Sequence, residues 1–243
     1  MGLLEVLTYF EIVKPSEKLA PTIWTISLLM IGLGSLGGII SEAVKNRFAA
    51  KRERYDKALM SLFIELCRDG GVRFEELGGS VYRAARWRRT IRYEDGTKGT
   101  RLVRVHRFRP SGFPAPSGIA WTDRTGAVGE CWTTRRPVYK DWHAVAKKYR
   151  EPITAGEFRS VSKKTKNGFE VEQFNAIARK YSEMQVVPIL DQAHDDRQIG
   201  VLSVDRLYVE DGVFQAVLDL RISLRLISAT SAAVGSILKP RDN

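Results

Sequence analysis

The spacing of apolar residues predicts a long helix over Ser41–Arg68, in which charged residues separate the apolar ones. The apolar positions at helical spacing are Phe48, Tyr55, Leu59, Leu62, Phe63 and Leu66. Gly70 and Gly71 follow and end this helix. A second long helix is expected from Asp211, as its N-cap, to about Leu238. Its apolar stripe comprises Val213, Val217, Leu220, Leu224, Ile227 and Val234.

Between these helices the alternation of residues predicts two pairs of antiparallel strands. Segments 80–93 (SVYRAARWRRTIRY) and 100–108 (TRLVRVHRF) flank an Asp-Gly turn, which is a hairpin signal. Segments 184–190 (MQVVPIL) and 199–207 (IGVLSVDRL) are separated by a polar run and form the second pair. We expect loops at 109–118 and around 162–168, and shorter helices at 142–150 and 171–181. This order predicts an α+β fold in which helices flank an antiparallel sheet.

One apolar stretch is long enough to cross a membrane. Residues 23–40 (IWTISLLMIGLGSLGGII) are 18 residues without a charge, and Trp24 lies in the first turn, where interfacial tryptophans are common. The alternative is a buried core helix. We therefore expect an extracytoplasmic tail over residues 1–21, a transmembrane helix over 22–41 and a cytoplasmic domain over 42–243.

Lysine and arginine counts predict the orientation of this span. Two precede it, Lys14 and Lys18, and six follow closely: Lys45, Arg47, Lys51, Arg52, Arg54 and Lys57. The excess places the C-terminal side in the cytoplasm of a single-pass protein of the cell inner membrane. Gly34 and Gly38 form a Gly-x-x-x-Gly pair, which can bring two such helices together or can reflect only a glycine-rich helix.

Charge and cysteine content limit the function classes. The net charge of +11 favours an acidic partner, such as a phosphorylated ligand, an anionic membrane or a nucleic acid. Cys67 and Cys131 are the two cysteines, too few for a disulfide framework or a zinc site, so no metal and no cofactor are expected. A nucleophilic Cys131 would need a nearby base, and nothing in the sequence orients His106, His143 or His194 toward it. We therefore expect no enzyme and no catalytic residue.

A basic segment leaves several uses open. Ten arginines and lysines lie between Arg83 and Arg109 against two acids, with Trp87 and Tyr93 interleaved. Such a segment suits single-stranded nucleic acid, the anionic inner leaflet, or phosphate capture by Arg107 or Arg136. It can also be a solvated sheet edge whose charges deter aggregation. Nucleic acid is the least favoured of these uses.

Three motifs together resemble the GAF domain family of sensory folds. Residues 125–142 (TGAVGECWTTRRPVYKDW) are similar to a Gly-x-x-Gly, short helix, basic residue and Pro-Val strand pattern, here Gly126, Gly129, Arg135-Arg136 and Pro137-Val138. The MQVVPIL and IGVLSVDRL strands supply the other two motifs. The resemblance covers roughly residues 44–240. The sequence lacks the cyclic-nucleotide-binding signature of phosphodiesterase-type GAF domains. It also lacks the cysteine sets of the bilin-binding and sulfoxide-reducing types.

The resemblance implies a ligand pocket between the sheet and the 125–142 stretch. Its expected residues are Arg107, Trp121, Arg124, Thr125, Gly126, Gly129, Trp132, Arg136, Tyr139, Trp142, Ser203 and Asp205. It also implies a homo-oligomer in which the first and last helices pair across the interface.

Three hypotheses follow. The first is a membrane-anchored sensor that binds a small anionic ligand, such as a cyclic nucleotide or other nucleotide second messenger. It signals through helix dimerisation to the membrane segment, which is either an anchor or itself the effector. The second is a ligand-free GAF-like scaffold that dimerises and recruits a cytoplasmic partner. The third is an enzyme that uses Cys131.

Overall fold

The computed structural model describes residues 20–85, 89–191, 193–194, 197–210 and 214–239, and of residues 20–40 it describes the backbone alone. The chain divides into two compact units, residues 1–51 and 52–243, and the helix α2 (Ala20–Gly70) begins in the first and ends in the second. Within the described part, no helix is long and apolar enough to cross a membrane. The expected tail, the expected span at 22–41 and its Gly34/Gly38 face lie outside the residues whose side chains are described, so they stay predictions.

A five-stranded antiparallel sheet forms the centre of the second unit, in the order β4-β1-β7-β6-β5. Its strands are β1 (Leu77–Ala84), β4 (Leu102–Phe108), β5 (Val138–Asp141), β6 (Tyr181–Asp191) and β7 (Arg197–Leu207). A small hairpin of β2 (Thr90–Arg92) and β3 (Lys98–Thr100) flanks the predicted Asp-Gly turn. Both predicted strand pairs are therefore confirmed.

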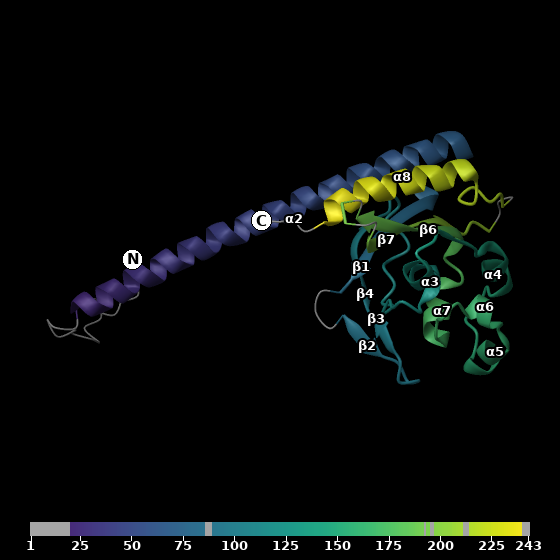
Figure 1. The fold of residues 1–243 in the computed structure, drawn as a ribbon, viewed down its shortest axis with the longest axis horizontal. Helices are drawn as coiled ribbons and strands as arrows, with labels where there is room; N and C mark the ends of the chain where they lie inside the picture. Colours follow the sequence, from purple (N-terminus) through teal and green to yellow (C-terminus); the bar gives the residue numbers. More distant parts are fainter. Residues whose placement is uncertain (1–19, 86–88, 192, 195–196, 211–213, 240–243) are drawn as a thin grey trace. The chain divides into compact units, whose positions relative to one another are not determined.

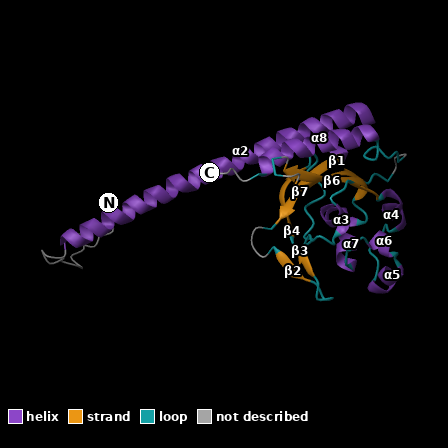
Figure 2. Ribbon diagram, in the orientation of Figure 1, coloured by secondary structure: helices purple, strands orange, loops and turns teal. Residues whose placement is uncertain are grey.

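Helices cover both faces of the sheet (Figures 1 and 2). The C-terminal half of α2 and the last helix, α8 (Arg221–Leu238), pack on one face. The helices on the other side are α3 (Gly126–Thr134), α4 (His143–Lys148), α5 (Ala155–Ser160), α6 (Lys163–Lys166) and α7 (Val171–Ile177). A 3-10 turn, η1 (Phe74–Glu76), joins α2 to β1. This arrangement confirms the predicted α+β class.

Each face of the sheet has its own apolar core. The first core joins α2 and α8 to the sheet and includes Leu59, Phe63, Leu202, Val204, Ile227 and Val234. The second core lies under α3 and α7 and includes Tyr82, Trp121, Cys131, Trp142, Phe169, Phe174 and Val201. Because side chains alternate along a strand, β1 and β7 contribute to both cores at once. A displacement on one face therefore has a direct path to the other.

Three predicted elements differ from the structure. The last helix begins at Arg221 instead of Asp211, which lies outside the described residues, because the buried carboxylate of Glu183 accepts the backbone N–H groups of Val217 and Leu218. Those N–H groups are thereby satisfied without a helix. The expected loop around 162–168 contains α6, which Ser162 caps. The helix expected over 171–181 ends at Ile177, and the chain enters β6 at Tyr181.

Adjacent residues of α2 test the first core. Phe63 is fully buried, whereas 54% of Ile64 is exposed. We expect Phe63→Ala to lower the free energy of unfolding by about 3–5 kcal/mol because it opens a cavity, and Ile64→Ala to change it by less than about 1 kcal/mol. Equilibrium denaturation of the full-length chain measures both, and equal losses would contradict the packing described.

Candidate functional site

Three arginines lie on the face of the sheet turned toward α3 and α7; we call Arg104, Arg107 and Arg109 the arginine column. Arg107 pairs across β1 with Ser80, which in turn pairs with Ser203 of β7, so one rung joins three strands. The register of β4 against β1 shifts between Val81 and Tyr82, where two β4 residues replace one. Because of this bulge, Arg104 and Arg107 face the same side although their spacing of three predicts opposite sides.

Arg109 is a buried charge with spare hydrogen-bond donors. Its side chain is 2% exposed, its Nη2 donates to the carboxylate of Asp205, and its guanidinium lies 5.7 Å from the ring centre of Tyr181. Nε and Nη1 have no hydrogen-bond partner among the described residues. A guanidinium presents five N–H donors and no acceptor, so these nitrogens need an acceptor that the described chain does not supply. Gly78 leaves room for this group, since a Cβ there would overlap it.

The surroundings of the column carry excess positive charge. Burial lowers the pKa of Arg109 to about 10, and the charge of Arg107 acts in the same direction. Burial also lowers the pKa of Arg107, and Arg104 adds to this effect. The pKa of Lys180 falls for the same two reasons, burial and then the charge of Arg107. Among the described residues, Asp205 supplies the carboxylate that forms an ion pair with the arginine column, through Arg109. The site therefore favours an added anion.

Aromatic side chains adjoin the column. Tyr82 is buried on β1, and its ring meets that of Trp121 edge to face at 5.3 Å between centres. Burial raises the pKa of Tyr82 to about 12, and the nearby charge of Arg104 opposes that rise. The Nε1 donor of Trp121 has no partner within the described residues. The same face thus presents ring surfaces and unpartnered donors beside three guanidinium groups.

The structure gathers most of the predicted pocket residues into two neighbouring groups on this face. Arg107, Ser203 and Asp205 lie on adjacent rungs of the sheet with Ser80 and Gly78. The other group lies in or against the second core: Trp121, Thr125, Gly126, Gly129, Trp132 and Trp142. Gly126 and Gly129 lie within the first turns of α3 rather than before it, and both approach neighbouring chain so closely that a side chain would clash. Whether any of these residues binds a ligand stays a prediction.

Three predicted residues lie elsewhere. Arg124 donates to Asp95 at 2.7 Å and lies over the ring of Tyr93, so it fastens the small hairpin. Arg136 is exposed after α3. The side chain of Tyr139 packs against the first core and donates to Glu183. The last placement follows from strand alternation, because the neighbouring Val138 belongs to the second core.

Cys131 is a packing residue in this structure. It is fully buried in the second core, and burial raises the pKa of its thiol to about 12. A thiol with that pKa stays protonated at neutral pH, whereas nucleophilic cysteines need a thiolate. Within the described chain, no group of three or more histidine, cysteine, aspartate and glutamate side chains could hold a metal ion.

Sequence reasoning missed Arg104, Arg109, Tyr82 and Tyr181. The alternation of Arg107 and Arg109 along one strand is a signal that could have paired them. Arg104 carried no such signal. The β-bulge that turns its side chain to this face cannot be recognised from the alternation of neighbouring residues. Tyr181 was assigned to the end of a helix, whereas it begins β6.

No known protein-family profile and no curated protein match the chain. Solved structures similar to it include the GAF domain of an Acinetobacter phosphoenolpyruvate-protein phosphotransferase, at 12% identity and a TM-score of 0.38 over 81% of this chain and 92% of that one. A GAF domain region of a Geobacter sulfurreducens protein, described as a membrane protein, has 16% identity and a TM-score of 0.43 over 81% and 97%. The GAF domain of a Bacillus halodurans two-component sensor histidine kinase has 14% identity and a TM-score of 0.37 over 73% and 91%. Likenesses of this size show nothing of a ligand, a partner or an output.

The ion pair of Arg109 and Asp205 makes a distinct prediction. Arg109→Met removes the guanidinium charge and leaves the carboxylate of Asp205 buried without its partner. We therefore expect the free energy of unfolding to fall by about 3–5 kcal/mol. Asp205→Val in the same chain removes the orphaned carboxylate and should restore a large part of that loss. Equilibrium denaturation of both single variants and of the double variant gives the coupling energy. Additive losses would show that the two groups are not coupled.

Proposed function

We propose that residues 52–239 form a GAF-like sensory domain that binds a small anionic ligand at the arginine column. The observation that carries the proposal is Arg109, a side chain 2% exposed whose Nε and Nη1 donors lack a partner among the described residues. Leaving such donors unpaired costs roughly 1–3 kcal/mol or more each, and a bound oxyanion would recover that cost. Arg107 and Arg104 add charge that no described carboxylate neutralises.

A nucleotide second messenger fits this chemistry. Its phosphate would meet the guanidinium groups, where charge-assisted hydrogen bonds are strongest. Its base would lie near the ring pair of Tyr82 and Trp121, and the Nε1 of Trp121 would donate to it. A ring-bearing carboxylate satisfies the same groups less completely, since it offers fewer acceptor oxygens.

The proposed signal passes through the sheet to the helix pair. β1 and β7 present Ser80 and Ser203 to the ligand face, and Val81 and Leu202 to the first core. A ligand that moves these strands therefore moves the packing surface of α2 and α8. Large apolar residues of these helices remain exposed, including Met60 and Ile64 on α2 and Ile222 on α8. They support pairing of the helices with a second copy, and the segment at 22–41 would carry that pairing to a membrane as the effector.

A ligand-free scaffold is the second candidate, and one observation favours it. The second core is filled by large side chains such as Trp121, Phe169 and Phe174, all 7% exposed or less. If that packing is complete, the domain serves dimerisation and partner recruitment, and the arginine column is a structural feature. Catalysis by Cys131 has no such support, because its thiol is buried and protonated.

Thermal unfolding of the full-length chain with a nucleotide panel separates the two candidates. The panel contains cyclic mononucleotides, cyclic dinucleotides and a nucleoside 5′-monophosphate. We expect at least one of these nucleotides to raise the melting temperature. Arg107→Gln should lower the affinity for that nucleotide by about 10–100-fold, because it removes a charge-assisted hydrogen bond. Arg136→Gln makes the same charge change at an exposed site away from the column and should leave the affinity unchanged.

Two outcomes would overturn the sensor proposal. The first is the absence of a shift with every nucleotide, which favours the scaffold. The second is equal weakening by Arg107→Gln and Arg136→Gln, which would show general charge attraction instead of a site.

A further inference from the structure

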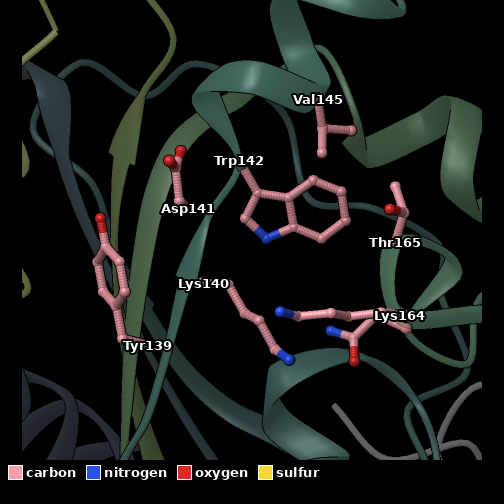
Figure 3. A pocket seen from close by; sticks show the side chains of 8 residues that line it. Tyr139, Lys140, Asp141, Trp142, Val145, Lys164 and Thr165 are labelled. Carbon is pink, nitrogen blue, oxygen red and sulfur yellow. The ribbon is translucent and has the colours of Figure 1, made fainter. Parts of the chain in front are cut away.

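A cavity lies at the other edge of the sheet, beside β5. Its volume is about 460 Å³, within the size range of small-molecule sites, and β5, the start of α4 and the region of α6 surround it. Figure 3 shows its lining side chains, with the nitrogen edge of Trp142 turned toward the region that Lys140 and Lys164 enter. β5 and β4 are opposite edges of the five-stranded sheet, so this cavity is separate from the arginine column.

The wall of the cavity contains two hydrogen-bond donors without a partner. Trp142 is 4% exposed, and its Nε1 has no partner within the described residues. The same holds for Nδ2 of Asn167, which also lines the cavity. An indole N–H can only donate, so a hydrogen-bond acceptor is the complement that the wall lacks. Native proteins rarely leave such groups unpaired, and a bound acceptor is one of the few explanations.

The main chain holds both donors in place. The backbone N–H of Trp142 donates to the carbonyl of Ser182 at 2.8 Å, and its ring packs at 6.2 Å from that of Phe169. Asn167 has a left-handed backbone with φ of 46°, and its carbonyl accepts the N–H of Gly126 at 2.8 Å. These contacts fix the backbone of Trp142 and Asn167 beside the cavity.

The charges around the cavity select the ligand. Lys164 is exposed and forms no ion pair within the described chain, whereas Lys140 pairs with Glu130 at 2.7 Å. The carboxylate of Asp141 is engaged with the backbone N–H of His143 at 2.8 Å. One free ammonium, one shared ammonium, the carboxylate of Asp141 and two neutral donors therefore line the cavity. The hydroxyl of Thr165 also lines the cavity and is hydrogen-bonded to that of Ser162 at 2.8 Å.

We infer that this cavity is an oxyanion site, which takes a phosphate or carboxylate group of a small metabolite. The oxyanion accepts hydrogen bonds from Nε1 of Trp142 and Nδ2 of Asn167 and forms an ion pair with Lys164. Lys140 adds long-range attraction from its pair with Glu130. The site does not depend on the arginine column, because no residue is shared between them.

The indole N–H of Trp142 is a direct reporter. We would label the full-length chain with ¹⁵N at tryptophan, assign the Trp142 resonance by its loss in Trp142→Phe, and titrate inorganic phosphate against sodium chloride of equal ionic strength. The expected result is a saturable downfield shift of that resonance with phosphate and none with chloride. Acetate in a parallel titration shows whether a carboxylate also binds.

Two lysines of α6 provide the matched comparison. Lys164→Gln should lower the affinity for phosphate about tenfold or more, because it removes the free ammonium that lines the cavity. Lys163→Gln removes the same charge from the neighbouring position, which does not line the cavity, and should leave the affinity unchanged. Arg107→Gln should also leave it unchanged, so the outcome here is independent of the nucleotide experiment. Absence of a saturable shift, or equal weakening by both lysine variants, would overturn the inference.

Discussion

The buried charge pair of Arg109 and Asp205 constrains the centre of this fold. A guanidinium can be taken out of water only where a carboxylate meets it. Arg109 directly follows β4 and Asp205 lies on β7, with β1 between these two strands. Gly78 of β1 allows the pair to meet, because any side chain there would occupy the guanidinium's place. One charge, one counter-charge and one glycine thus constrain how three strands lie together, and two guanidinium nitrogens remain without a partner among the described residues.

The two faces of the sheet differ in the residues that they present. The face under α2 and α8 carries the first apolar core, which suits a stable surface for two helices. The other face mixes aromatic rings with serines, arginines and an aspartate, which suits recognition. Cationic groups stand at both edges, at the arginine column on β4 and at Lys140 and Lys164 near β5. Part of the net charge of +11 is therefore concentrated beside spare donors instead of being spread evenly over the surface.

The sequence was sufficient for elements whose pattern is local. The apolar period of α2, the alternation in β6 and β7 and the proline-rich loop after β4 are all recovered. What failed depends on contacts between distant residues. The start of α8 is set by Glu183, which lies on β6, and the grouping of Arg104 with Arg107 is set by a bulge against β1. The cavity beside β5 was not foreseen either, because it brings Trp142 and Asn167 together through tertiary packing of short helices.

The central claim is that the arginine column holds a small anionic molecule. Native mass spectrometry of the full-length chain, purified from the organism that encodes it, tests this without a choice of ligand. The account predicts an added mass that collision releases as a single anionic small molecule, retained in Arg136→Gln and lost in Arg107→Gln. A wild-type chain that carries no added mass, or an added mass that survives Arg107→Gln, would contradict it.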